Sequence, residues 1–332
     1  MRPFHYEHAA DRAQALRAAG DAGGAVEYLA GGTTLIDLMK LDVMRPGIVV
    51  DINELQREHG EVRPERDRLR LGALARMSEV AADPVVRRDY PVIAQSLNLA
   101  ASPQIRNMAS LGGNVLQRTR CPYFRDTGWR ACNKRDPGSG CAAITGVKRR
   151  LAILGVSDRC IANYPGDFAV ALAALRASVD LEGPKGSRVI PIEKLHRLPA
   201  ETPHVETTLE PGELITGFSV PAAPWLRRSL FLKIRDRQSY EFAIASAAVA
   251  LDIADGAVRQ ARIALGGLAA KPWSASEAEA ALVGHPLSEA TAQAAAEQAF
   301  ARAVAPGDLA FKLELGRRTL VRALLAAGAL EV

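Results

Sequence analysis

The sequence contains no long apolar run. No stretch approaches the roughly 20 consecutive apolar residues that a membrane-spanning helix requires. The opening residues, MRPFHYEHAADRAQ, also include no apolar core of the kind that signal peptides have. With 48% hydrophobic and 24% charged residues the composition is that of an ordinary globular chain, so we expect a protein with no membrane partner and no export signal of its own.

Aromatic residues are scarce, at 5%, and they are not interleaved with basic residues as in nucleic-acid-binding motifs. The net charge of +5 arises mainly in one stretch, residues 118–150, which holds nine Lys or Arg and two Asp. A basic surface of this kind can bind phosphates, offset a buried anionic cofactor or dock an acidic partner. Because no DNA-binding pattern accompanies it, we expect no nucleic-acid partner.

Two familiar nucleotide-binding motifs are missing: the Walker loop with its Gly-Lys-Ser/Thr ending, and the GxGxxG of dinucleotide-binding folds. Instead, Gly31 and Gly32 in LAGGTTLIDLMK stand between a predicted strand and a predicted helix, where backbone N–H groups can converge on an anion. The stretch QIRNMASLGGNVL repeats this chemistry at Ser110, Gly112, Gly113 and Asn114. Two phosphate-sized sites suit a dinucleotide, while the alternative for the first is an ordinary glycine turn capped by Thr33 or Thr34.

Hydrophobic periodicity predicts an α+β protein of three subdomains: 1–54, 55–220 and 221–332. In the first two, helices are predicted at 11–20, 34–41, 90–101 and 165–177, and strands at 25–30, 47–52, 68–75 and 178–183. Pro165 is placed for the first turn of its helix. In the third, strands at 229–236, 246–253 and 258–269, the last two joined by a hairpin turn at 254–256, precede helices at 274–282, 288–304 and 310–326.

The chain has only four cysteines, all within forty residues of sequence: Cys121, Cys132, Cys141 and Cys160. Cysteines that fill cores would be expected to scatter, so this grouping indicates one shared site, in an insertion that covers residues 118–162. The spacings match neither a zinc ribbon nor a ferredoxin run. Zinc, a 4Fe-4S cluster and disulfides all remain open, although a chain of this size without a signal peptide has little need of disulfides.

Six motifs in order along the chain resemble the FAD-binding medium subunit of the molybdenum hydroxylase (xanthine dehydrogenase) family. They are AGGT, IRNMASLGGN, PGDFAVALAAL, GELITGFSVP, FLKIRDRQSYEFAIASAAVAL and IALGGLAAKPW. The resemblance implies a two-subdomain FAD-binding fold of the vanillyl-alcohol-oxidase (PCMH-like) type and a C-terminal α/β subdomain of antiparallel sheet and helices. It also implies FAD as cofactor.

The resemblance assigns the FAD site residue by residue. One side of the pyrophosphate is expected at Leu29, Ala30, Gly31, Gly32, Thr33, Thr34 and Leu35, and the other at Ser110, Gly112, Gly113 and Asn114. Asp167 is expected at the ribose or adenine end. Ile215 and Lys233 are expected near the flavin ring, where the lysine would favour a reduced, anionic flavin. No catalytic residue is expected beyond the flavin itself.

The cysteine-rich insertion is similar to one in a subset of these subunits, notably those of bacterial periplasmic aldehyde oxidoreductases. This resemblance implies a 4Fe-4S cluster bound by the four cysteines, which the surrounding Arg and Lys would favour. It implies a heterotrimer with a large molybdenum-cofactor subunit and a small 2Fe-2S subunit, in which electrons reach FAD and then an external acceptor. It also implies assembly in the cytoplasm, with possible export to the periplasm on a partner's signal.

Two other function classes are consistent with parts of the sequence. One is a stand-alone FAD-dependent oxidoreductase of the vanillyl-alcohol-oxidase type, whose phosphate-binding segments follow a similar plan. The other is a zinc-stabilised nucleic-acid-binding module, which only the basic cysteine-containing stretch supports.

Overall fold

The computed structural model describes residues 1–21 and 26–332 of the chain. Its N-terminal part is a parallel sheet in the order β1-β3-β2, with strands β1 (His5–His8), β2 (Val26–Leu29) and β3 (Ile48–Asp51). Helices α1 (Arg12–Asp21) and α2 (Leu35–Lys40) connect these strands. The predicted alternation of strand and helix is confirmed. Strand β1 was not predicted. Residue 25, the first of the strand predicted at 25–30, lies outside the described residues.

The middle part is an antiparallel sheet in the order β4-β5-β8-β6-β7. Its strands are β4 (Val62–Pro64), β5 (Arg68–Gly72), β6 (Ser178–Gly183), β7 (Gly186–Pro191) and β8 (Leu214–Pro221). The short helix α3 (Gln56–His59) precedes the sheet. Between β5 and β6 lie α4 (Met77–Ala82), α5 (Pro84–Asp89), α6 (Pro91–Asn98), α7 (Pro103–Met108), α8 (Leu111–Val115), α9 (Pro122–Arg125) and α10 (Phe168–Ala174).

The prediction that Pro165 opens a helix is wrong. Helix α10 begins at Phe168, and Asp167 takes its N-cap position. The residues just before it are held outside the helix by Tyr164, whose backbone N–H donates to the carbonyl of Ala269 at 2.9 Å and whose hydroxyl donates to that of Val115 at 2.8 Å. Every residue of α10 is buried, so this apolar helix lies inside the protein rather than on its surface.

The C-terminal part is an antiparallel sheet in the order β12-β11-β10-β9, followed by helices. Its elements are β9 (Ser229–Ile234), β10 (Ala245–Ala254), β11 (Ala257–Gly266), β12 (Trp273–Ser274), α11 (Ser276–Leu282), α12 (Glu289–Ala299) and α13 (Ala310–Gly328). The predicted hairpin turn is confirmed. Asp255 and Gly256 join β10 to β11 with φ of 55° and 77°, the left-handed pair that a tight two-residue turn requires.

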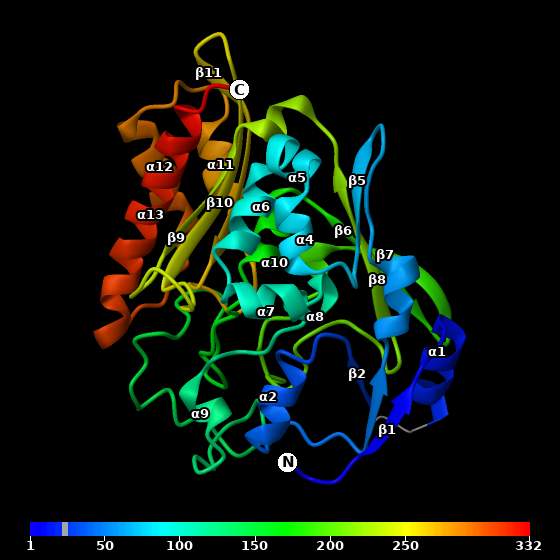
Figure 1. The fold of residues 1–332 in the computed structure, drawn as a ribbon. Helices are drawn as coiled ribbons and strands as arrows, with labels where there is room; N and C mark the ends of the chain where they lie inside the picture. The colour runs from blue at the N-terminus through cyan, green and yellow to red at the C-terminus, as the bar shows by residue number, and fades with distance from the viewer. Residues whose placement is uncertain (22–25) are drawn as a thin grey trace.

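Helices separate the second and third sheets, as Figure 1 shows. Helices α11 and α13 pack on one face of the C-terminal sheet, while α6 and α10 pack on the other. Residues of β9, β10 and β11, including Phe231, Ala248 and Ala264, belong to the same apolar core as the middle sheet. The two parts therefore share a core, and the predicted α+β fold class is confirmed. No helix in the described part of the chain is long and apolar enough to cross a bilayer.

Candidate functional site

The first glycine segment, Ala30–Thr34, connects the end of β2 to the start of α2. An added Cβ at Gly31 would lie 1.9 Å from the carbonyl oxygen of Met108, so only glycine fits there. Gly32 has a φ of +68°, which glycine adopts without strain. Thr34 occupies the N-cap position of α2, but its side chain makes no capping hydrogen bond. Of the alternative, a turn capped by Thr33 or Thr34, the cap by Thr34 is therefore not what the structure shows.

The flanking leucines support this segment from both sides. Leu29 ends β2, and its carbonyl accepts a hydrogen bond of 3.0 Å from the backbone N–H of Ile52. Leu35 begins α2 and is buried against Met39 and Val49. The backbone hydrogen bond of Leu29 and the buried side chain of Leu35 fix the strand and the helix, and so position the backbone of the segment between them.

The second glycine segment, Ser110–Asn114, forms the start of α8. The Ser110 hydroxyl accepts a hydrogen bond of 3.2 Å from the N–H of Gly113, while Gly112 donates to the carbonyl of Ala73 at 2.8 Å. The side-chain oxygen of Asn114 is buried and has no hydrogen-bond partner within the described part of the chain. A buried acceptor without a partner is costly, so this oxygen is suited to receive a donor from a bound molecule.

The two glycine segments lie against each other, because Gly31 packs on Met108 and Ala109, the residues just before Ser110. Two side chains that the sequence analysis did not identify hold them there. Arg76 donates to the carbonyl of Met108 at 2.6 Å and to the side-chain oxygen of Asn53 at 3.0 Å. Asn53 in turn donates to the carbonyl of Ala30 at 3.1 Å. No local motif marks either residue, since both act across long stretches of sequence.

Asp167 and Lys233 form a buried ion pair. The Lys233 ammonium, on β9, lies 2.6 Å from a carboxylate oxygen of Asp167 and donates to the carbonyl of Leu99 at 3.1 Å; the two side chains are 1% and 4% exposed. Burial raises the pKa of Asp167, and the charges of Lys233 and Arg235 oppose that shift. Asp167 and the Leu99 carbonyl occupy two of the three ammonium donors, which leaves one for a ligand.

Ser246 lies beside Lys233, its cross-strand neighbour in the pairing of β9 with β10. Its hydroxyl is buried and has no hydrogen-bond partner among residues 1–21 and 26–332. Ile215, by contrast, lies in β8, pairs with Leu181 and belongs to the apolar core of the middle part. The structure thus joins Lys233 to Asp167 but places Ile215 in a different sheet from Lys233.

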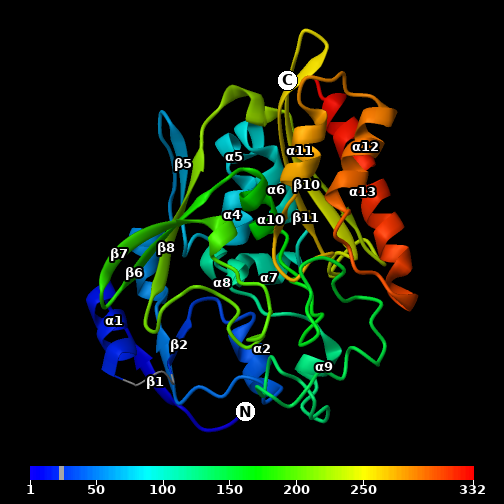
Figure 2. The same ribbon diagram turned by 180° about the vertical axis from the view of Figure 1, so that it is seen from behind.

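The cysteine segment, residues 118–162, runs from the end of α8 towards α10 with little regular structure apart from α9. It lies beside α2 and below the C-terminal helices, as the green trace around α9 shows in Figure 2. Cys132 and Cys141 face each other in an antiparallel bridge, flanked by a hydrogen bond of 2.7 Å from the N–H of Asn133 to the carbonyl of Gly140. All four cysteines are free thiols.

The four cysteines line one small cavity together with Tyr123, Phe124 and Ala162. Three of them are buried and Cys141 is partly exposed. Lys134 and Arg159 also line the cavity, and no acidic residue does. Burial raises the pKa of Cys121 to about 12 and also raises that of Cys160, where the charge of Lys134 opposes the shift. Burial therefore favours neutral thiols, whereas the cationic lining of the cavity favours an anionic occupant.

The side chains around this cavity are not arranged to coordinate a single metal ion. Within residues 1–21 and 26–332, no group of three or more His, Cys, Asp or Glu side chains is arranged to hold a metal ion. Four thiolates around one zinc ion, at about 2.3 Å each, would lie only about 3.8 Å from one another.

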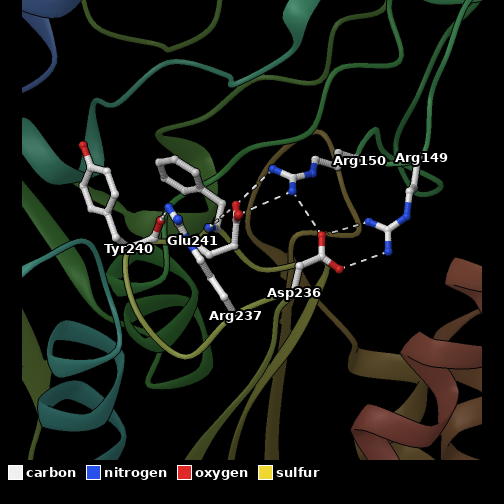
Figure 3. A network of polar contacts seen from close by, with 7 residues as sticks. Arg149, Arg150, Asp236, Arg237, Tyr240 and Glu241 are labelled. Carbon is white, nitrogen blue, oxygen red and sulfur yellow. Dashed lines mark hydrogen bonds and ion pairs between the residues drawn. The ribbon is translucent and has the colours of Figure 1, made fainter.

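The positive charges of the cysteine segment are largely paired within the molecule. Arg120 and Arg125 bind Asp37 on α2 at 3.1 and 2.8 Å, and Arg118 and Lys134 bind Glu206. Figure 3 shows the third group, in which Arg149 and Arg150 both reach the carboxylate of Asp236 at 3.0 Å and Arg150 also binds Glu241. Asp236 and Glu241 lie in the loop between β9 and β10. These pairs fix the segment to three separate parts of the fold.

Comparison with known proteins agrees with this architecture over the whole chain. Residues 2–223 match the FAD binding domain of molybdopterin dehydrogenases, and residues 231–332 match the C-terminal domain of CO dehydrogenase flavoproteins. The chain is 44% identical over 330 residues to the aldehyde oxidoreductase FAD-binding subunit PaoB of Escherichia coli K12, covering 99% of both chains. It is 25% identical over 336 residues to the carbon monoxide dehydrogenase medium chain of Hydrogenophaga pseudoflava.

The solved structures give the same result. The carbon monoxide dehydrogenase of Hydrogenophaga pseudoflava superimposes with a TM-score of 0.77 at 27% identity, over 99% of each chain. The quinoline 2-oxidoreductase of Pseudomonas putida 86 shares the fold, with a TM-score of 0.74. Two family models together cover nearly all of the chain, and one relative is 44% identical along its full length. The chain belongs to the FAD-binding medium subunits of the molybdenum hydroxylase family, which are subunits of oxidoreductases.

Proposed function

We propose that this chain carries electrons through FAD within a molybdenum-containing aldehyde oxidoreductase. A large molybdenum-cofactor subunit would oxidise the aldehyde, a small 2Fe-2S subunit would pass the electrons on, and this subunit would deliver them to an external acceptor. The proposal rests on the full-length similarity to an aldehyde oxidoreductase subunit. Membership of the family disfavours a stand-alone oxidase of the vanillyl-alcohol type, because family medium chains are parts of larger enzymes.

We further propose that the two glycine segments hold the pyrophosphate of FAD between them. Their contact at Gly31 and Met108 brings the backbone of both into one place, and the unpartnered oxygen of Asn114 lies in the second. Backbone N–H groups at the start of α2 would donate to phosphate oxygens. At the start of α8 the N–H groups of Gly112 and Gly113 already bind Ala73 and Ser110, so this segment would contribute the Asn114 side chain. Asp167 and Lys233 would contact the same part of FAD, since their charged groups lie 2.6 Å apart, and Ile215 in β8 would contact another part. The flavin itself supplies the electron-transfer chemistry, and the protein binds and orients it.

Gly31→Ala tests this assignment, because the new Cβ would overlap the Met108 carbonyl and separate the two segments. The purified complex should lose most of its flavin absorbance while the circular dichroism of the rest stays close to wild type. Asn114→Ala is a milder second variant that should weaken FAD retention without a steric clash. Full flavin content in both variants would contradict the assignment. Gly256→Ala, at the distant β10–β11 turn, is a control that should keep its flavin.

We propose that the cysteine cavity binds a 4Fe-4S cluster through Cys121, Cys132, Cys141 and Cys160. The four thiols line one cavity whose charged lining residues are both cationic, which suits the net negative charge of a cluster with four thiolates. The family resemblance and the cationic lining favour the cluster over zinc, since within the described residues no group of three or more His, Cys, Asp or Glu side chains is arranged around a metal position of either kind. A zinc-stabilised nucleic-acid-binding module also loses its support, because most of the basic residues are paired internally.

Metal analysis of the purified complex and a cysteine variant test the cluster. Wild type should contain about four more iron atoms per complex than Cys132→Ser, with flavin largely retained in both. Equal iron contents would contradict the ligand assignment, and zinc in place of iron would favour the alternative. Because cofactor insertion takes place in the cytoplasm, we propose assembly there, with export to the periplasm only on a partner's signal.

A further inference from the structure

A partly buried pair of opposite charges adjoins the cysteine cavity. Lys134, two residues after Cys132, lines the cavity with the four cysteines, and its side chain is only 11% exposed. Its ammonium lies 3.1 Å from a carboxylate oxygen of Glu206 and donates to the carbonyl of Pro203 at 3.0 Å. A lysine whose ammonium is held by two acceptors cannot swing freely into solvent, so its charge stays next to the cavity that it lines.

The lysine belongs to a group whose net charge is positive. Glu206 also binds Arg118, so two cations share one carboxylate. Burial opposes ionisation of Glu206, but the charges of Arg118 and Lys134 outweigh it and lower the pKa of this acid. Glu206 is therefore ionised at neutral pH, and the three side chains together place one surplus positive charge beside the cavity.

We propose that Lys134, positioned by Glu206 and the Pro203 carbonyl, raises the reduction potential of the iron–sulfur cluster. This inference rests on the cluster proposed above. Reduction adds one electron to a buried group that is already anionic, and a fixed cation in surroundings of low dielectric constant favours that added charge. Hydrogen bonds and charges around a cluster are known determinants of its potential. Lys134 is accordingly a positioning residue for redox chemistry, not a ligand.

The proposal predicts shifts of opposite sign for the two partners. Lys134→Met removes the cation next to the cavity, so the cluster should become harder to reduce and its midpoint potential more negative. Glu206→Gln removes the anion, keeps a hydrogen-bond acceptor for Lys134 and leaves both cations, so the midpoint potential should become more positive. Lys134→Arg keeps the charge and should stay near wild type. A general loosening of the structure would not shift the midpoint potential in opposite directions for substitutions at two neighbouring residues.

The experiment is a potentiometric titration of the purified complex with dithionite as electron donor, followed by the electron paramagnetic resonance signal of the reduced cluster. One electron per cluster is taken up, and we expect Lys134→Met to change the reduction equilibrium constant at least tenfold, about 59 mV for a one-electron couple. Arg130→Gln is the matched control, since this exposed residue of the same segment does not line the cavity.

The outcomes separate this inference from the cluster assignment. Iron retained in both variants, with midpoint potentials unchanged or shifted in the same direction, overturns the role of Lys134 and leaves the cluster standing. A wild-type complex that contains no more iron than the Cys132→Ser complex overturns both. If Lys134→Met fails to assemble a cluster, the other two variants test the role of Lys134. The midpoint potential of Glu206→Gln must still become more positive, and that of Lys134→Arg must stay near wild type.

Discussion

The guanidinium of Arg125 binds the carboxylate of Asp37 through two hydrogen bonds, of 2.8 and 3.1 Å, across 88 residues of sequence. Arg120 binds the same carboxylate at 3.1 Å. The two arginines stand on either side of Cys121 and α9 begins between them, while Asp37 lies in α2, directly after the first glycine segment. The element that would ligate metal is thus connected to the element that would bind phosphate.

We expect Asp37→Asn to weaken this connection. The substitution removes the negative charge that two arginines share, so the free energy of unfolding should fall by about 1–2 kcal/mol, as for a partly exposed, charge-assisted hydrogen-bonded network. The cysteine segment should also be cut faster by trypsin in the native state. Urea unfolding and timed proteolysis measure the two effects.

Asp42→Asn provides the comparison for that variant. Asp42 also binds two arginines, Arg2 and Arg45, but these pairs are exposed and neither arginine belongs to the cysteine segment. Its loss should lower the free energy of unfolding less than Asp37→Asn does and leave the trypsin cleavage rate unchanged. Equal cleavage rates for Asp37→Asn and wild type would show that Asp37 does not hold the segment in place.

Much of the fold was readable from local patterns. Alternating and helical periodicity located the C-terminal strands and helices, and Asp255-Gly256 marked its hairpin because a tight turn needs two residues with positive φ. The start of α10 was misplaced because a proline is compatible both with a helix's first turn and with the extended chain before it. Here the hydrogen bonds of Tyr164 to distant carbonyls decide for the extended form.

The site was only partly readable. Glycines and clustered cysteines are visible in sequence because their chemistry depends on residue type and spacing. The side chains that connect them, Arg76, Asp37 and Glu206, are ordinary charged residues whose partners lie far away along the chain. Their roles depend on tertiary contacts, which no local pattern encodes. The resemblance assigned Asp167 and Lys233 separately, and their direct contact emerges only in three dimensions.

Removal of Lys233 should destabilise the protein in a pH-dependent way. Lys233→Met leaves the buried Asp167 carboxylate without its counter-ion, which should cost about 3–5 kcal/mol near pH 7. Burial raises the pKa of Asp167, and the substitution removes the lysine charge that opposes the shift. An acid with a raised folded-state pKa contributes stability at low pH and loses it as pH rises, so the deficit should shrink between pH 7 and 5.

Urea unfolding at pH 5, 6 and 7 measures that trend. The double variant Lys233→Met/Asp167→Asn has no carboxyl group to protonate at this position. Its difference from wild type should therefore vary much less with pH than that of the single variant. A deficit for Lys233→Met that is constant from pH 5 to pH 7 would contradict the buried ion pair.

The network in Figure 3 should contribute little to global stability but hold one loop in place. The Arg150 side chain is 56% exposed and binds Asp236 and Glu241 in the β9–β10 loop. Arg150→Gln should lower the free energy of unfolding by no more than about 1 kcal/mol, and high salt should reduce the difference. Amide exchange in residues 235–242 should become faster at low salt. Arg259→Gln, which removes an exposed pair with Asp255 at the β10–β11 turn, should leave that exchange unchanged.

We expect Lys312 to make the free energy of unfolding rise as the pH becomes alkaline. This α13 residue is fully buried, and its ammonium donates to the carbonyls of Leu151 and Gly267 at 2.8 and 2.7 Å. Burial lowers its pKa to about 7, with a smaller contribution from Arg149. In the unfolded chain the pKa of a lysine is about 10.4. Between these values the unfolded chain binds more protons than the folded chain, so the free energy of unfolding should rise with pH.

The rise attributable to Lys312 should reach about 2 kcal/mol between pH 7 and pH 9. Lys312→Met should be less stable overall, because the two carbonyls lose their donor, but it should lack this rise. Denaturant unfolding at pH 7, 8 and 9 gives the two slopes, and Lys40→Met, at the exposed end of α2, should keep the wild-type slope. Parallel slopes for wild type and Lys312→Met would mean that the lysine stays charged in the folded protein. Because Leu151 belongs to the cysteine segment, this charged lysine would then join the segment to α13.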